Sequence, residues 1–96
     1  MAFLIDAVID DYEVRGVTTG TSKKGNTFKA IKLESAEGRS CEVSCTDETL
    51  FSFVDSLSKG DVITCKVRAV SAQKYSYISL LSAPVVKGNS YKGVEY

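Results

Sequence analysis

Histidine is absent from the 96 residues of the chain. Because histidine is the commonest general base and a frequent zinc ligand, its absence argues against acid–base catalysis and against a zinc site. The sequence also lacks a phosphate-binding glycine loop, a nucleophile elbow and a convincing catalytic pair of carboxylates. The adjacent Asp10 and Asp11 are interpreted as part of a solvated turn. We therefore expect a protein that is not an enzyme and that holds no metal or cofactor.

Long apolar runs are also missing, and none approaches the roughly 20 residues that span a bilayer. The opening MAFLIDAVI carries Asp6 and no basic residue, which is unlike a signal peptide. The three cysteines are an odd number, which favours reduced thiols. Cys41 and Cys45 share one face of a predicted strand with Val43, so we interpret them as core residues rather than metal ligands. We expect a cytoplasmic protein, bacterial or phage-encoded, without a membrane partner.

The formal net charge is zero, but the charges are segregated along the chain. Residues 1–14 carry only acids, residues 15–33 only bases, residues 34–61 mostly acids, and residues 62–94 again only bases. If the two basic blocks meet in the fold, they form one positive face suited to an anionic ligand. The alternative is a set of solvated strand faces that never converge.

Alternating apolar residues predict five strands, and one segment has the helical period. The strands are expected over residues 12–21, 27–34, 39–45, 63–70 and 77–83. Gly16 and Gly20 inside the first strand suggest a bulge or sharp bend. Within residues 46–57, Leu50, Phe53, Val54 and Leu57 form the apolar face of an amphipathic helix, with Thr46 or Asp47 as its N-cap. Residues 1–11 form an extension that is either a strand or a short helix, and residues 84–96 are expected to be a mobile tail.

This order of three strands, a helix and two strands (β-β-β-α-β-β) is similar to that of the OB-fold, a five-stranded barrel. The resemblance covers residues 12–83 and makes the chain an all-β domain with one helix. The first hairpin also resembles single-stranded DNA-binding proteins of filamentous phages in Ser22, Lys23, Gly25 and Phe28. In that family the basic residue contacts phosphate and the aromatic ring stacks on a base, which implies these roles for Lys23 and Phe28. Two departures from the family pattern are Thr27, where the phage proteins have proline, and the longer helix.

An OB-fold binds ligands on the face of its second and third strands, between two flanking loops. Both loops here combine lysine with aromatic residues, as single-stranded nucleic-acid binding requires. The candidate binding residues are Lys23, Lys24, Phe28, Lys29, Lys32, Lys66, Arg68, Lys74, Tyr75 and Tyr77. Phe28 has the parity opposite to Ile31 and Leu33, which favours an outward-facing ring unless a bulge places it in the core. Tyr75 and Tyr77 have the parity opposite to Ile78 and Leu80 and are expected to face outward. We expect a protein that coats single-stranded DNA without sequence preference and forms a homodimer or higher oligomer. A module for protein–protein contacts within an assembly and a single-stranded RNA binder remain the alternatives.

Overall fold

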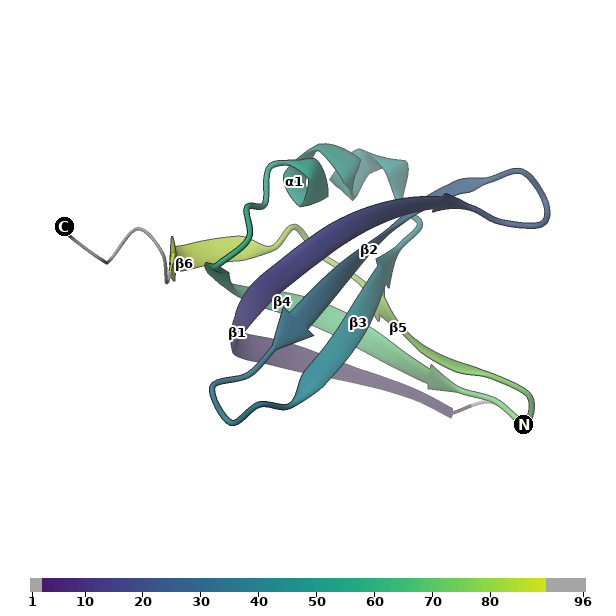
Figure 1. The fold of residues 1–96 in the computed structure, drawn as a ribbon. Helices are drawn as coiled ribbons and strands as arrows, with labels where there is room; N and C mark the ends of the chain where they lie inside the picture. The colour runs from purple at the N-terminus through teal and green to yellow at the C-terminus, as the bar shows by residue number, and fades with distance from the viewer. Residues whose placement is uncertain (1–2, 90–96) are drawn as a thin grey trace, which may run out of the picture.

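The computed structural model describes residues 3–89 of the chain as six strands and one short helical segment (Figure 1). The strands are β1 (Phe3–Thr21), β2 (Thr27–Glu34), β3 (Ser40–Cys45), β4 (Asp61–Ser71), β5 (Ser76–Leu80) and β6 (Val85–Asn89). The helical segment consists of the 3₁₀ turn η1 (Glu48–Leu50) and α1 (Phe51–Asp55). It lies between β3 and β4 in the chain, as the sequence predicted.

The strands form one sheet that closes on itself. Its order is β1-β2-β3-β5-β4-β6, and β1 also pairs with β4, so that the first five strands make a barrel. All pairings are antiparallel except β3 with β5, which is parallel and extends only over Val43↔Ile78 and Ser44↔Ser79. The expected fold, all-β with one helix and a five-stranded OB-fold barrel, is therefore confirmed.

Strand alternation explains the core. Successive side chains of a strand point to opposite faces, so every second residue enters the barrel. In β2, Ile31 and Leu33 are completely buried, whereas Lys32 between them is exposed. Ile63, Cys65 and Val67 of β4 meet these residues in one cluster. Residues of the opposite parity, such as Lys32 of β2, Glu42 of β3 and Tyr77 of β5, face outward, and this outer face carries the side chains considered below.

The long strand β1 serves both sides of the barrel because it bends. Its first half pairs with β4 and its second half with β2, and its register shifts between Val14 and Gly16 and between Ile9 and Tyr12. Asp11 at the second shift has a φ of 59°, a left-handed conformation tolerated by aspartate. The bulge near Gly16 agrees with the bend expected from its glycine. Of the two options for residues 1–11, the described part from Phe3 onward is a strand.

The helical segment is shorter than the predicted residues 46–57. Asp47 is the N-cap, and its carboxylate accepts hydrogen bonds from the backbone N–H and hydroxyl of Thr49. Val54 is completely buried, but Phe53 is 49% exposed. Its assignment to the buried face was wrong, because the first turn is 3₁₀ and α1 has only five residues, so the apolar residues do not keep one helical period.

The expected mobile tail, residues 84–96, begins instead with a strand. β6 pairs with the start of β4, and Lys87 holds it to β1 through Asp10 at 2.7 Å and Asp11 at 3.1 Å. Asn89 donates a hydrogen bond of 2.7 Å to the buried carboxylate of Asp61. All of these partners lie far away in the sequence, so local composition gave no sign of them. Residues 90–96 lie outside the described part of the chain.

The cysteines have the structural role inferred from the sequence. Cys45 and Cys65 are buried in the core, and Cys41 is half-buried beside it. Burial raises the pKa of all three thiols, to about 11 for Cys65, so they are poor nucleophiles at neutral pH.

Within residues 3–89, no group of three or more His, Cys, Asp or Glu side chains is placed to hold a metal ion. The helix found in that range is too short to cross a membrane.

Candidate functional site

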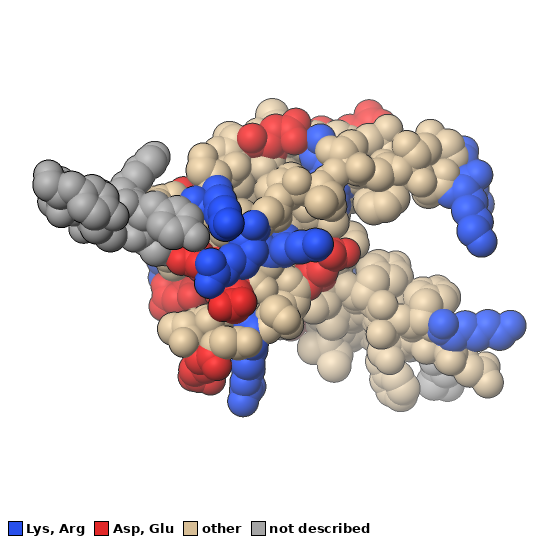
Figure 2. All heavy atoms as spheres, viewed as in Figure 1, with Lys and Arg blue, Asp and Glu red and all other residues tan. Residues whose placement is uncertain are grey.

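Two hairpins project from the same end of the barrel and leave a gap between them (Figure 1). One joins β1 to β2 through residues 22–26, and the other joins β4 to β5 through residues 72–75. In the first turn, Gly25 adopts a φ of +86° and its N–H bonds the Ser22 carbonyl at 2.9 Å. Figure 2 shows basic side chains at the ends of both projections. Lys23 and Lys24 belong to the first turn and Lys74 to the second, and all three have exposed side chains.

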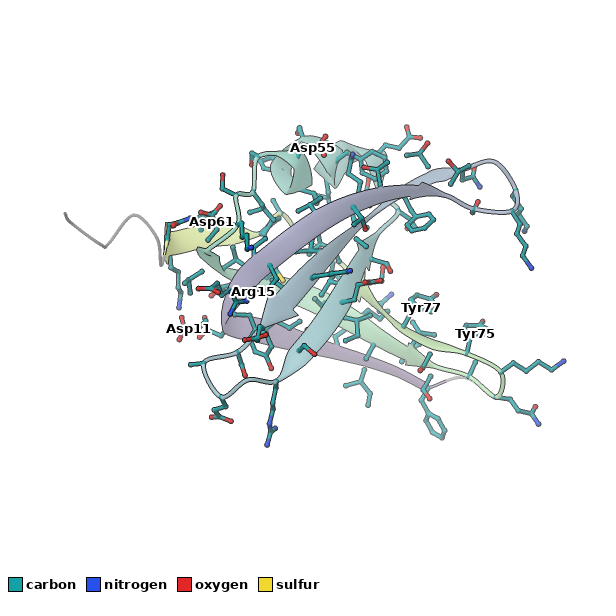
Figure 3. The ribbon with its side chains drawn as sticks, viewed as in Figure 1. Asp11, Arg15, Asp55, Asp61, Tyr75 and Tyr77 are labelled. Atoms are coloured by element: carbon teal, nitrogen blue, oxygen red, sulfur yellow. The ribbon has the colours of Figure 1, made fainter. Side chains whose placement is uncertain are left out.

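The β4–β5 hairpin carries an exposed aromatic pair. Tyr75 and Tyr77 are 59% and 46% exposed, and their rings stack with centroids 5.8 Å apart and planes inclined by 17°. In Figure 3 both rings, Tyr75 from the turn and Tyr77 from β5, project toward the gap between the hairpins. Tyr77 has the parity opposite to the inward-pointing Ile78, as the sequence predicted. Two nearly parallel exposed rings form a surface on which a flat apolar group can stack.

The β1–β2 hairpin carries the third aromatic ring. Phe28 lies on the outer face of β2, opposite Gly20 of β1, and is half-buried. A Cβ atom at Gly20 would lie 2.6 Å from Cζ of Phe28, so the ring rests on the bare backbone of this glycine. Phe28 also borders a surface hollow with Ser22, Asn26 and Glu48. Its ring is thus fixed on one side and open toward this hollow on the other.

Lys32 connects the two aromatic regions. It lies on the outer face of β2, directly opposite Glu42 of β3, and it is exposed. Glu42 and Tyr77 line a common hollow of about 370 Å³ where β3 and β5 separate. The outer face therefore continues from Phe28 and Lys32 on β2, across Glu42 on β3, to Tyr77 on β5.

Three of the candidate residues lie elsewhere or are already paired. Lys29 points inward at the end of the barrel, where its ammonium group bonds Asp55 of α1 at 2.8 Å and Thr19 at 3.1 Å, and only 12% of the side chain is exposed. Arg68 forms a two-bond pair with Asp6, at 2.7 and 3.1 Å. This pair holds the pKa of the Asp6 carboxyl below its usual value. Lys66 is exposed but lies beside Val8 on the β1–β4 side of the barrel.

The two basic blocks of the sequence do not merge into one positive face. Several of their members pair with the acidic blocks instead, as in Arg15 with Glu13 and Glu34, Arg68 with Asp6, and Lys87 with Asp10 and Asp11. Among residues 3–89, the lysines whose ammonium groups have no hydrogen-bonded or ionic partner are Lys23, Lys24, Lys32, Lys59, Lys66 and Lys74. Three of these six stand at the hairpin tips, so that is where unpaired positive charge concentrates.

Two residues of this region were missed from the sequence. Gly20 was interpreted only as a bend, although it lies as far before the turn as Phe28 lies after it. Counting outward from the turn would have paired the two residues. Glu42 gave no comparable signal, because its proximity to Tyr77 depends on the parallel pairing of β3 with β5.

Substitution of Gly20 tests whether it positions the Phe28 ring. We predict that Gly20→Val displaces the ring, because a side chain cannot occupy the same space. Binding of any ligand that stacks on Phe28 should then weaken severalfold, with little change in its salt dependence. Gly16→Val is the matched control, because a Cβ there meets nothing within 4 Å. Equal affinities of the two variants would show that the Gly20–Phe28 contact has no part in binding.

The closed barrel, the parallel β3–β5 pairing and the helix before β4 define the OB-fold. The crystal structure of Rim1, a mitochondrial single-stranded DNA binding protein from S. cerevisiae (Form1), superimposes with a TM-score of 0.73. The match has 15% sequence identity and covers 92% of this chain and all of the Rim1 chain. A second chain of the same protein, selenomethionine-labelled (Form2), gives a TM-score of 0.73 at 14% identity over 92% of this chain and 98% of its own.

At these identities the likeness establishes the fold and nothing finer. No protein-family model matches the sequence. No curated protein matches it by sequence either. The structural comparison supports the expected OB-fold but gives no support to the particular resemblance with filamentous-phage proteins.

Proposed function

We propose that the protein binds single-stranded DNA across the face of β2 and β3 and between the two hairpins. The observation that carries the proposal is the placement of unpaired lysines on both hairpins, beside the exposed Tyr75 and Tyr77 on one hairpin and the half-buried Phe28 on the other. The OB-fold of Rim1, whose name describes it as a single-stranded DNA binding protein, supports the same function. The proposed interface consists of Lys23, Lys24, Phe28, Lys32, Lys74, Tyr75 and Tyr77.

Charge and stacking have separate tasks in this interface. Lys23, Lys24 and Lys74 contact phosphates, and because lysine contacts are ionic they depend on salt but not on sequence. Phe28 and the Tyr75–Tyr77 pair receive bases on their faces, which every base can offer. The protein therefore coats single strands with little sequence preference, as replication and related processes require. Lys29 and Arg68 are left out because they are already paired, and Lys66 because it lies on another side of the barrel.

Titration with labelled oligonucleotides tests the proposal. We expect the protein to bind oligo-dT more tightly than duplex DNA of the same length, because only unpaired bases reach the rings. The affinity should fall steeply between low and moderate salt, since bound lysines release counterions. Oligo-U in the same titration shows whether RNA is an equal ligand. No binding to either single strand would overturn the proposal and favour a module for protein–protein contacts.

We further propose that the protein forms a dimer through the first half of β1. Over residues 3–9 this strand pairs only with β4, so its other edge is open within the described part of the chain. Phe3, Leu4, Ile5 and Val8 on it are 59–65% exposed. An open apolar edge strand is normally covered by another chain or protected by charge. A second copy, related by a two-fold axis, would cover both its edge and its apolar side chains.

Light scattering tests the dimer. We predict a mass of at least two chains for the unmodified protein and a shift toward the monomer in Val8→Lys, because lysine on an edge strand disfavours pairing. Val85→Lys is the control, since Val85 is 62% exposed but lies on β6. A monomer at every practical concentration, or an equal loss of mass in both variants, would contradict this interface.

A further inference from the structure

On the outer face of the sheet, a lysine, a glutamate and a tyrosine occupy adjacent register positions on β2, β3 and β5. Lys32 of β2 is the register partner of Glu42 of β3. The parallel pairing of β3 with β5 includes Val43↔Ile78, so Glu42 and Tyr77 are the next positions, where the ladder has ended. Val43 and Ile78 pack in or against the core, and their neighbours Glu42 and Tyr77 therefore face outward together.

Because the β3–β5 pairing stops before Glu42 and Tyr77, the two strands separate there and leave the hollow of about 370 Å³ that these two residues line. Its other walls are mostly apolar and come from Cys41, Ala69, Val70 and Ile78, with the hydroxyl-bearing Ser71 and Ser76. The carboxylate of Glu42 has no hydrogen-bonded or ionic partner among residues 3–89. An aromatic wall, an apolar floor and one charged acceptor suit a flat ring that carries N–H donors.

We propose that this hollow is a nucleotide subsite that prefers guanine. The inference rests on the proposed binding of single-stranded DNA and adds a base preference at one position of an otherwise sequence-tolerant path. The base stacks on Tyr77 and presents its Watson–Crick edge to Glu42. The adjoining phosphate lies within the reach of Lys32, whose ammonium group is unpaired in the described part of the chain.

The preference follows from the chemistry of a carboxylate. An ionised glutamate only accepts hydrogen bonds. Guanine offers two adjacent donors, N1–H and the N2 amino group, which match the two carboxylate oxygens. Cytosine and adenine offer one amino group next to a ring nitrogen that is itself an acceptor, and the single N3–H of thymine lies between two carbonyl oxygens. Hydrogen bonds to a charged acceptor are also the stronger ones, so guanine gains most.

Glu42 could instead act only as a countercharge to Lys32. Its carboxylate would then repel phosphate from this part of the face, whatever base is present. Removing its charge would raise the affinity for all single strands alike. The subsite predicts a loss that is confined to guanine, so the two roles give opposite results.

The experiment compares three oligonucleotides: oligo-dT, the same strand with one central dG, and the same strand with deoxyinosine in place of that dG. For the unmodified protein we expect the dG strand to bind about tenfold more tightly than oligo-dT, as one good two-bond base contact allows. Deoxyinosine keeps N1–H but lacks the amino group, so its strand should fall between the two. In Glu42→Gln the three affinities should converge. Glu37→Gln, in the exposed turn before β3, should leave the order unchanged.

The outcomes separate the subsite from the proposed function. If no strand binds, both fail. If oligo-dT binds with the expected salt dependence but dG brings no gain, the function stands and the subsite fails. A uniform gain for all strands in Glu42→Gln, or a guanine preference that survives this substitution, would also overturn the subsite. The dG and deoxyinosine comparison on the unmodified protein keeps the test valid if Glu42→Gln folds poorly.

Discussion

Replacing both Tyr75 and Tyr77 by alanine is expected to weaken binding of single-stranded DNA by roughly 1–3 kcal/mol for each base that the pair holds. The two rings stack at 5.8 Å and face the gap between the hairpins, so they act as one platform (Figure 3). No phosphate contact is lost, and the dependence of the affinity on salt should therefore barely change. Because both rings are largely exposed, the melting temperature should also stay near that of the unmodified protein.

Two comparisons sharpen this prediction. The double Tyr→Phe variant keeps both rings and should bind almost as tightly as the unmodified protein. Phe53→Ala removes an exposed ring from α1, outside the proposed interface, and should leave the affinity unchanged. An alanine double variant that binds normally would remove the β4–β5 hairpin from the interface.

Neutralising the hairpin tips is the second large change. In the triple variant Lys23→Gln, Lys24→Gln, Lys74→Gln, the slope of log K against log salt should fall in magnitude by about 2, since each phosphate contact contributes about 0.7 on a single strand. If the affinities coincide near 1 M salt, that difference amounts to about a hundredfold at 0.1 M. The loss should be the same for all sequences, because phosphates carry no sequence information.

Lys66→Gln is the matched control for this variant. Lys66 is also exposed, and its ammonium group has no hydrogen-bonded or ionic partner in the range 3–89, but it lies on the β1–β4 side of the barrel. Its removal should change the slope little. An unchanged slope in the triple variant, or an equal change in Lys66→Gln, would show that phosphates do not follow the hairpins.

Features encoded by local patterns could be predicted from the sequence. The alternation of Ile31, Lys32 and Leu33 gave both the strand and its buried face, since parity alone decides which side chains enter a barrel. The order of elements then indicated the OB-fold, whose two ligand-binding loops correspond here to the turns that contain Gly25 and Lys74. The outward positions of Phe28 and Tyr77 followed from the same parity.

Features that depend on distant partners could not be predicted. Lys29 was a candidate because it is a basic residue near the first turn. Its ammonium group instead bonds Asp55, which lies 26 residues away along the chain (55 − 29). The strand β6 depends on Lys87 meeting Asp10 and Asp11, which only the closed barrel brings close. Charge segregation along the sequence likewise left open whether the two basic blocks meet, and in the fold several of their members pair with acids on other strands instead. Each of these contacts is set by sheet register, and local composition does not fix register.

Photo-crosslinking of an oligo-dT in which thymines are replaced by 5-iodouracil tests the path of the strand most directly. This base reacts with aromatic side chains that it contacts, and mass spectrometry of the digested protein identifies them. We predict crosslinks at Phe28 and at Tyr75 or Tyr77, with none at the exposed Phe3 or Phe53. Their yield should fall as salt rises, as binding weakens. Crosslinks confined to Phe3 or Phe53, with Phe28, Tyr75 and Tyr77 unmodified at full binding, would contradict a path between the two hairpins.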